Sequence, residues 1–344
     1  NSRAEVGFDP EASVFVRHRL SAYNLAIPGT GILSVRKQAE YLHQIGIKPK
    51  AAIVGVEFLD FLEVHQARTA ATSPVHPVDG DRHSVARWFW RFDSLFSLAS
   101  LKDAIRTLFL QRDDEAETMT SRGFNPLKEY GPIVRSEGYF TLFRQRAQEN
   151  TRTYLRKAQG LLSRSDFGHL RAILDLAAES GSDTTLIIYP YHAQILAIFE
   201  EVGLAHTFEE WKNLLISEVS AARLRHPDAN IALYDFSGYG RYNCERIPAK
   251  GDRVSATRWY WEAGHFKKQL GDIVLASAFS GSTGPRPVAH DVPETPGKFG
   301  FRLEESNRTR NIERIRLERS ECMQDYPELF AEVAALVADE RSGK

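Results

Sequence analysis

The residues best suited to chemistry stand near the two ends of the chain. Glu262 precedes His265 by three positions, so its carboxylate can orient the imidazole along a helix or across a turn. Ser2 carries a hydroxyl that becomes a nucleophile when a neighbouring imidazole takes its proton. We therefore expect a Ser–His–carboxylate site for acyl-ester chemistry, in which Ser2 attacks, His265 is the general base and Glu262 orients it.

The elements that must position these residues follow from four short apolar segments. They are residues 23–27, 51–56, 184–189 and 231–234. Helical patterns at 170–179 and 207–225 precede the last two segments. Continuous apolar strands that alternate with helices predict a parallel sheet covered on both faces. The expected fold class is α/β, a three-layer α/β/α doubly wound parallel sheet in the flavodoxin-like order.

Several residues able to do chemistry follow these predicted strands. They are Gly29, Glu57, His192 and Asp235, and Ser2 would follow a further strand upstream of Asn1. Because the carboxyl ends of parallel strands open on one crevice, we expect these residues to converge there. Asp235 is interpreted as a turn or cap residue, and His192 either touches substrate or has a structural role.

His265 is expected to open a helix. The apolar face of that helix would pack beside the first strand and consists of Phe266, Leu270, Ile273 and Val274. The oxyanion that develops during ester cleavage needs N–H donors, and the backbone N–H groups of Ser2 and Gly29 are the candidates. A glycine at a strand end lets the main chain approach the substrate closely.

Two regions depart from the alternating pattern. An insertion of about 62–152 interrupts it, and residues 88–109 of this insertion are strongly apolar. We interpret residues 88–109 as a helix pair over one edge of the sheet; the alternative is an aromatic platform for a glycan or a surface resting on a membrane. The α/β domain covers residues 1–280 and includes this insertion. Residues 281–344 form a loop and a helical tail, whose stretch 308–338 packs on the body or meets a partner.

Bulk properties exclude some functions. The 344 residues carry a formal net charge of −1, which provides no general attraction to nucleic acid. No apolar run reaches the ~18 residues of a membrane helix. The chain lacks an initiating Met, so we expect a fragment or processed form whose membrane association would come only through a segment absent from it. No metal-ligand spacing is present, no cofactor is expected, and Cys244 and Cys322 could form one disulfide.

Three sequence blocks resemble the SGNH (GDSL-like) hydrolase superfamily, in particular its cell-envelope branch of alginate and exopolysaccharide O-acetylation proteins. Residues 1–10, Asn-Ser-Arg-Ala-Glu-Val-Gly-Phe-Asp-Pro, resemble the first block without its leading Gly. Residues 24–29, Asn-Leu-Ala-Ile-Pro-Gly, resemble the second, and residues 262–266, Glu-Ala-Gly-His-Phe, the last. The resemblance implies a serine esterase or O-acetyltransferase acting on acetyl esters of a cell-envelope or exported polysaccharide, in the envelope or periplasm.

Two positions depart from the pattern of that superfamily. The third block of the superfamily is Gly-x-Asn-Asp, whose Asn donates to the oxyanion. Residues 55–58 of this chain read Gly-Val-Glu-Phe, so Glu57 must be protonated, turned away or used otherwise. Glu262 stands where the pattern has Asp, one methylene shorter. Glu57 favours an alternative, a catalytically inactive protein that binds polysaccharide or an assembly partner. Possible substrate-binding residues are Arg3, Asn24, Glu57 and His192, although a salt bridge to the body is the default for Arg3.

A nucleotide-binding, flavodoxin-like protein is a third hypothesis. Residues 28–31, Pro-Gly-Thr-Gly, do not form a Gly-x-Gly-x-x-Gly motif, and the sequence contains no P-loop. The sequence therefore favours acyl-ester chemistry over nucleotide binding.

Overall fold

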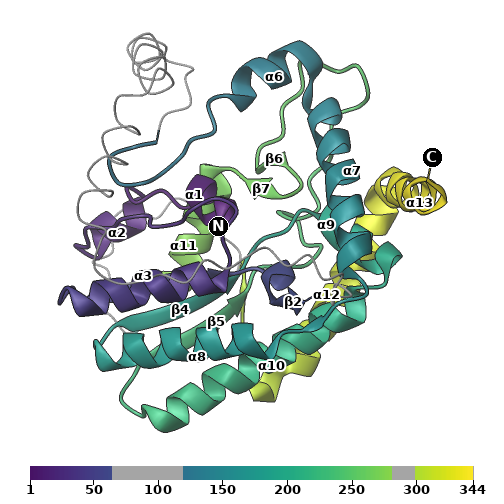
Figure 1. The fold of residues 1–344 in the computed structure, drawn as a ribbon. Helices are drawn as coiled ribbons and strands as arrows, with labels where there is room; N and C mark the ends of the chain where they lie inside the picture. Colours follow the sequence, from purple (N-terminus) through teal and green to yellow (C-terminus); the bar gives the residue numbers. More distant parts are fainter. Residues whose placement is uncertain (64–118, 281–298, 344) are drawn as a thin grey trace, which may run out of the picture.

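Three of the predicted apolar segments form the parallel strands of a four-stranded, mostly parallel sheet (Figure 1). The computed structural model describes residues 1–63, 119–280 and 299–343. Strands β1 (Ala51–Val56), β4 (Asp183–Ile188) and β5 (Ile231–Asp235) run parallel, and β8 (Phe301–Arg302) pairs antiparallel with β5. The prediction of an α/β protein with a largely parallel sheet is confirmed.

The register of this sheet aligns the carboxyl ends of its parallel strands. Val56 pairs with Ile188, and Ile188 pairs with Asp235. All three side chains are fully buried or nearly so, which is typical of a sheet covered on both faces. The segments that begin at Glu57, Tyr189 and Phe236 therefore leave the sheet along one edge.

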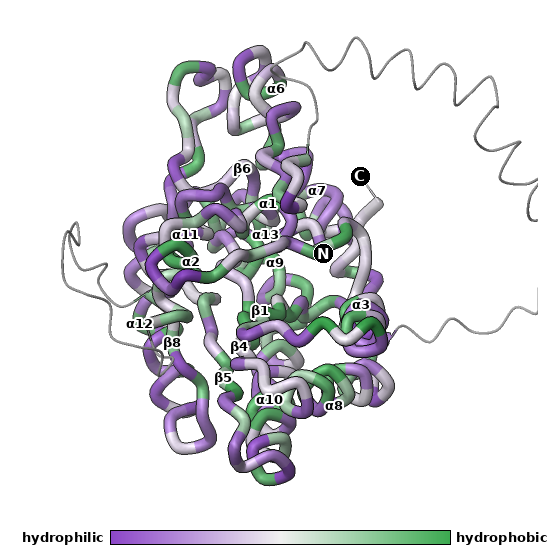
Figure 2. The backbone as a smooth tube through the Cα atoms, turned by 90° about the vertical axis from the view of Figure 1, so that its left-hand side faces the viewer, coloured by the Kyte–Doolittle hydropathy of each residue, from purple (hydrophilic) through white to green (hydrophobic). Residues whose placement is uncertain are grey.

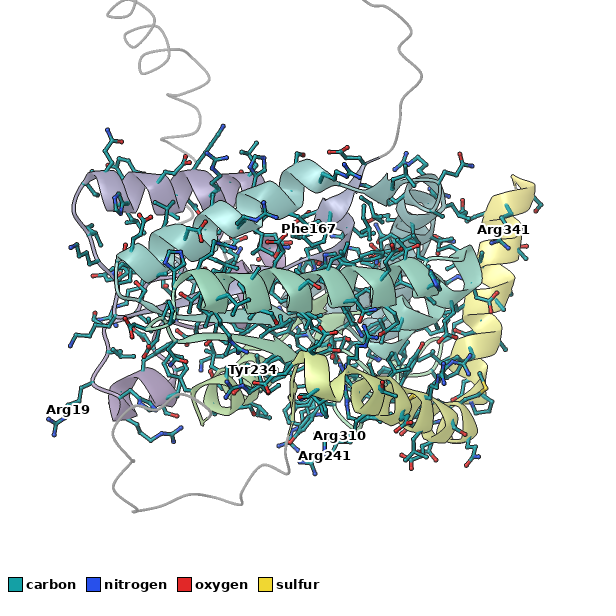
Figure 3. All side chains as sticks on the ribbon, turned by 90° about the horizontal axis from the view of Figure 1, so that it is seen from below. Arg19, Phe167, Tyr234, Arg241, Arg310 and Arg341 are labelled. Carbon is teal, nitrogen blue, oxygen red and sulfur yellow. A yellow bond between two sulfur atoms is a disulfide. The ribbon has the colours of Figure 1, made fainter. Side chains whose placement is uncertain are left out.

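Helices cover both faces of the sheet. In Figures 2 and 3, α3, α8 and α10 lie on one side of the strands, and α2, α11 and α12 lie on the other. Contacts of α8 with α3 and β4, and of α10 with β5, join the first layer to the sheet. The bounds of these helices are α2 Ser13–Arg17, α3 Ile32–Gln44, α8 Arg164–Glu179, α10 Ala205–Arg225, α11 Lys268–Ser280 and α12 Arg308–Asp325.

The prediction of a strand at residues 23–27 is wrong. This segment has no regular secondary structure, and its large side chains Tyr23, Leu25 and Ile27 are exposed. The backbone N–H of Asn24 donates to the carbonyl of Arg122 rather than to a sheet neighbour. An apolar run becomes a strand only where another strand pairs with it. Gly29 consequently lies in an exposed turn, with φ of 70°, and not at a strand end.

An aromatic cluster fixes the segment that follows β1. The 3₁₀ helix η1 (Phe58–Phe61) places Phe58 in complete burial, with its ring centroid 5.1 Å from that of Phe208 and 5.6 Å from that of Trp211. Short strand β2 (Leu62–Glu63) then pairs with β3 (Leu161–Leu162). Because Phe58 is anchored in the core, the preceding Glu57 is held at the edge of the sheet.

In the second half of the predicted insertion, residues 119–129 form neither helix nor strand, and two helices follow them. Helices α6 (Tyr130–Glu137) and α7 (Tyr139–Lys157) rise beside the sheet, and α7 packs on α9 (Ala193–Val202). Residues 88–109 lie outside the described residues, so the helix pair and the aromatic or membrane surface expected there stay predictions.

The C-terminal helices pack on the body of the protein. After η2 (Glu305–Asn307) and α12, helix α13 (Pro327–Ser342) contacts both α7 and α9. A disulfide joins Cys322 of α12 to Cys244, with 6.0 Å between the Cα atoms. In the part of the chain that the structure describes, no helix is both long and apolar enough to cross a bilayer.

Candidate active site

The three residues predicted to form the site are joined by hydrogen bonds. Ser2 begins helix α1 (Ser2–Gly7), and its Oγ lies 2.9 Å from Nε2 of His265. The other ring nitrogen of His265, Nδ1, bonds to Oε1 of Glu262. The second carboxylate oxygen of Glu262 accepts the backbone N–H of Gly264 at 2.7 Å. Serine hydroxyl, imidazole and carboxylate thus form one chain in the order needed for nucleophilic catalysis.

A tight hairpin, and not a helix, positions His265. Strands β6 (Tyr260–Glu262) and β7 (His265–Phe266) pair antiparallel, with Glu262 opposite His265 across the turn. The prediction that His265 opens a helix is wrong, because α11 begins only at Lys268. The sequence also allowed Glu262 to orient the imidazole of His265 across a turn, and this is the arrangement in the hairpin. Backbone pairing across this turn places the carboxylate beside the imidazole.

Close packing of two glycines brings α1 to this hairpin. A Cβ on Gly7 would lie 1.9 Å from the buried ring of Phe266, and a Cβ on Gly271 would lie 1.7 Å from the carbonyl oxygen of Gly7. Real Cβ atoms do not approach other atoms this closely, so any side chain here would push α1 away. Gly7 and Gly271 therefore help to set the distance between Ser2 and His265. No local sequence pattern identifies this pair of glycines.

Asn24 holds α1 in place from its other side. Its side-chain amide donates to the carbonyl of Ala4 at 2.7 Å and to that of Phe8 at 2.8 Å. Its side-chain oxygen accepts the N–H of Ala26 at 3.0 Å. The amide is thus engaged in positioning the helix that carries Ser2, and its contact with a substrate stays a prediction.

Glu262 is suited to stabilising a positive imidazole. Its side chain is almost fully buried. Burial alone would raise the pKa of Glu262, but the adjacent His265 and the hydrogen bonds from that ring and from Gly264 lower it below the usual value. Glu262 therefore remains ionised at neutral pH and could stabilise a protonated imidazole at His265.

Glu57 is neutralised by partners within the protein. Its carboxylate forms an ion pair with the guanidinium of Arg3 and accepts the hydroxyl of Tyr191 at 3.0 Å. Burial raises the pKa of Tyr191, so this hydroxyl keeps its proton and donates. Arg3 also lies over the Tyr191 ring, 5.0 Å from the centroid. The expected salt bridge of Arg3 is confirmed. Glu57 was expected to be protonated, turned away or used otherwise, and the structure shows its carboxylate in an ion pair with Arg3.

Arg3 retains hydrogen-bonding capacity beside the site. Its Nε is buried and has no partner within residues 1–63, 119–280 and 299–343. A Cβ on Gly264 would lie 3.7 Å from Arg3 Nη2, so the guanidinium extends to the turn between Glu262 and His265. Arg3 thus places a positive charge between Glu57 and the turn of the hairpin.

His192 occupies a fully buried position behind the site. Its Nε2 donates to the carbonyl of Glu245 at 2.8 Å, and its Nδ1 accepts the N–H of Gln194 at 3.2 Å. Burial lowers the pKa of His192 to about 4, so the ring is neutral near pH 7. Both nitrogens serve the protein, and the structural alternative for His192 fits this environment.

Asp235 is the turn residue that the sequence predicts. Its Oδ1 accepts the N–H of Ser237 at 2.8 Å. Its Oδ2 accepts Asn311 at 2.8 Å and faces the ammonium of Lys212 at 3.1 Å. The buried partners Lys212 and Asn311 come from distant helices, and no local sequence pattern identifies them. Asp235 fastens α10 and α12 to the end of β5.

Lys267 is a further residue near the site that the sequence did not single out. Its ammonium donates to the hydroxyl of Tyr139 at 2.7 Å and lies 4.6 Å from the centroid of the Trp261 ring. Burial lowers the pKa of Lys267 to about 8, although Glu245 opposes this effect. Lys267 ties the β6–β7 hairpin to α7.

Gly29 was predicted to be an oxyanion donor because it would follow a strand. In the structure it follows no strand. Its N–H as an oxyanion donor stays a prediction.

Within the described ranges, no group of three His, Cys, Asp or Glu side chains could hold a metal ion. No protein-family model, curated protein or solved structure matches this chain. The geometry of the site is therefore the basis for inferring what the protein does.

Proposed function

We propose that this protein is an SGNH-like serine esterase or O-acyltransferase. It acts on acyl esters, chiefly acetyl esters, of a cell-envelope or exported polysaccharide. The observation that carries the proposal is the hydrogen-bonded series Ser2, His265 and Glu262. A flavodoxin-like order of the doubly wound sheet belongs to the same proposal.

The first half-reaction would form an acyl-enzyme. Ser2 Oγ attacks the ester carbonyl while His265 Nε2 takes its proton, and Glu262 stabilises the imidazolium. The tetrahedral intermediate collapses when His265 returns the proton to the departing alcohol oxygen. This step breaks the ester bond and leaves the acyl group on Ser2.

The second half-reaction would free Ser2. His265 takes a proton from water or from a sugar hydroxyl, whose oxygen attacks the acyl-enzyme. Collapse of the second intermediate returns the proton to Ser2 Oγ. Water as acceptor makes the protein an esterase, and a sugar hydroxyl makes it a transferase.

Backbone N–H groups would stabilise the oxyanion. The first residues of an α-helix have N–H groups without intrahelical partners, and Ser2 is the first residue of α1. Its N–H is thereby free to donate to an oxygen bound next to Oγ. The ion pair with Arg3 supports this arrangement, because it offsets the negative charge that Glu57 would otherwise bring near the oxyanion.

A location in the cell envelope or periplasm is part of the proposal. The disulfide between Cys244 and Cys322 supports it, because such bonds persist in oxidising compartments and are rare in the cytosol.

A catalytically inactive protein that binds polysaccharide or an assembly partner is the second candidate. Glu57 favours it, because a carboxylate replaces the side-chain amide that would donate to the oxyanion. An esterase or transferase requires Ser2 as its nucleophile, whereas a binding protein does not require Ser2.

The test is release of acetate from an O-acetylated polysaccharide and from nitrophenyl acetate, with and without an added sugar acceptor. Ser2→Ala and His265→Ala should abolish release or transfer. Matched controls are Ser13→Ala and His43→Ala, since both residues are exposed and lie on other helices. Polysaccharide binding that persists in Ser2→Ala, without turnover by the unaltered protein, would replace the first proposal by the second.

A further inference from the structure

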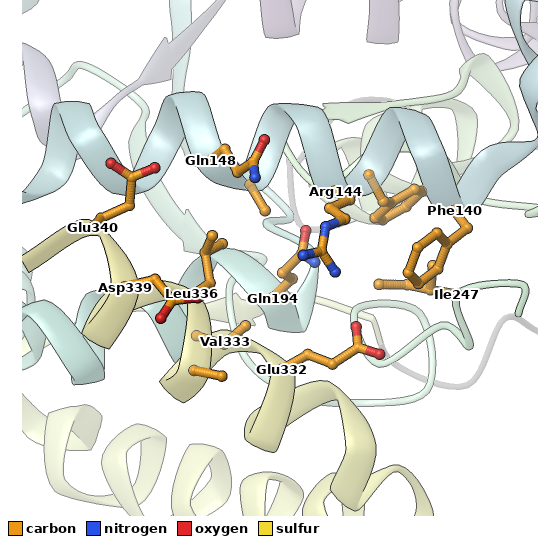
Figure 4. A pocket seen from close by; sticks show the side chains of 13 residues that line it. Phe140, Arg144, Gln148, Gln194, Ile247, Glu332, Val333, Leu336, Asp339 and Glu340 are labelled. Carbon is orange, nitrogen blue, oxygen red and sulfur yellow. The ribbon is translucent and has the colours of Figure 1, made fainter. Parts of the chain in front are cut away.

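A pocket of about 180 Å³ lies between α7, α9 and α13, and none of its lining residues belongs to the Ser–His–Glu site (Figure 4). An apolar cavity of roughly 150 Å³ can hold a benzene-sized molecule. The pocket is therefore large enough for one six-membered ring.

The buried lining residues of the pocket are apolar except for one amide side chain. Phe143, Ala147 and Val333 line it and are each about 1% exposed. Gln194 is 6% exposed, and Figure 4 shows its side chain pointing from α9 into the space between the other two helices. Its Oε1 is buried and accepts no hydrogen bond from any described residue. A buried acceptor without a donor is costly, so this position fits a ligand that donates a hydrogen bond.

The rim of the pocket is charged and mainly acidic. Glu332, Asp339 and Glu340 line it together with a single cation, Arg144. Glu340 pairs at 2.9 Å with Arg152, which does not line the pocket. Within the described ranges, Glu332, Asp339 and Arg144 form no ion pair. The unpaired rim charges therefore sum to one negative charge, which favours a cation over an anion.

We propose that this pocket binds a single amino-sugar ring of the hexosamine type. A hydroxyl of the ring donates to Oε1 of Gln194, and the ring carbons pack on the buried apolar side chains. The ammonium group lies at the acidic rim, where Glu332 and Asp339 offer acceptors. Arg144 donates to ring hydroxyl oxygens, and Phe140 contributes an aromatic side chain to the wall.

This inference does not depend on Ser2 chemistry, because the pocket shares no lining residue with that site. The charge of the rim can separate sugars that have the same size. A uronic acid has nearly the same volume as a hexosamine, but its carboxylate would meet the acidic rim. The pocket should therefore discriminate between sugars by charge.

The test is titration of the whole protein with glucosamine, glucose and glucuronate, followed by ligand-observed NMR below neutral pH. We expect glucosamine to bind most tightly, glucose less tightly and glucuronate least tightly. Gln194→Met should weaken the binding of both glucosamine and glucose by about tenfold, since it removes the acceptor but keeps an unbranched side chain. Asp339→Asn should weaken the binding of glucosamine about threefold and leave the binding of glucose unchanged.

Gln145→Met is the matched control, because Gln145 lies on the exposed side of α7 and does not line the pocket. It should bind all three sugars as the unaltered protein does. Thermal unfolding of each variant checks its fold, and the exposed Asp339 keeps the test available if Gln194→Met does not fold. The proposal is overturned if neither glucosamine nor glucose binds, or if glucuronate binds as tightly as glucosamine.

Discussion

Ser2 Oγ lies 2.9 Å from Nε2 of His265, although 263 positions separate the two residues in the sequence. The contact depends on α1, whose Gly7 packs directly on Phe266 of the same hairpin that carries His265. The hairpin also supplies Glu262. Two short elements thus bring together all three groups that acyl transfer by a serine requires.

Glu262→Gln should lower kcat/KM for ester hydrolysis by about a thousandfold to ten thousandfold, because an amide cannot stabilise the imidazolium and favours the wrong tautomer. Glu262→Asp keeps the charge but shortens the reach to His265, so its loss should be smaller. Steady-state kinetics with nitrophenyl acetate measure both. An activity of Glu262→Gln within tenfold of the unaltered protein would refute the role of Glu262.

The pair of Arg3 and Glu57 should be strongly coupled. Their side chains are only 14% and 4% exposed, and Arg3→Gln would leave Glu57 buried without its cation. Loss of one partner of such a pair costs about 3–5 kcal/mol, whereas removal of both costs less. Chemical unfolding of Arg3→Gln, Glu57→Gln and the double variant forms the thermodynamic cycle. Additive effects in the double variant would show that the two residues do not interact.

Much of the site follows from the sequence because its key relationships are local or topological. Glu262 and His265 are three positions apart, so either a helix or a turn would join them. The strands at 51–56, 184–189 and 231–234 are long enough and apolar enough to identify, and their ends carry Glu57, His192 and Asp235.

The rest could not be predicted because it depends on partners distant in sequence. Residues 23–27 have the composition of a strand, but no neighbouring strand pairs with them. The ion pair of Arg3 with Glu57 spans 54 positions, and nothing local marks it. Two cysteines can be counted in a sequence, whereas the 6.0 Å between their Cα atoms is known only from the fold.

Asp60 should make stability depend on pH. Burial raises the pKa of Asp60 to about 6, against the nearby positive charge of Arg3. An unfolded Asp has a pKa of about 3.9, so between these values the folded state binds more protons and stability falls as pH rises. Asp60→Asn should therefore raise the free energy of unfolding at pH 7 by about 1–2 kcal/mol.

This gain from Asp60→Asn should disappear as the pH approaches about 4, where Asp60 is protonated in the folded state and increasingly in the unfolded state. Denaturant unfolding across that pH range measures it. Asp183→Asn is the control, since Asp183 is exposed. Equal stability of Asp60→Asn and the unaltered protein at every pH would contradict the prediction.

The disulfide should stabilise the C-terminal helices against the body. Cys244 and Cys322 are 78 positions apart, and a closed loop of this length contributes about 4 kcal/mol in the chain-entropy description. Cys244→Ser combined with Cys322→Ser should lower the free energy of unfolding by roughly 2–4 kcal/mol. Reduction of the unaltered protein should produce a similar loss, and no change in either experiment would contradict the prediction.

Labelling with a fluorophosphonate tests the central claim most directly, because the probe reacts with an activated serine and not with an ordinary hydroxyl. Peptide mass spectrometry then locates the adduct. We predict a single adduct on Ser2 that is absent in Ser2→Ala and in His265→Ala, and that persists in Ser13→Ala. The absence of an adduct on Ser2, under conditions that label a known serine esterase, would contradict the proposed chemistry.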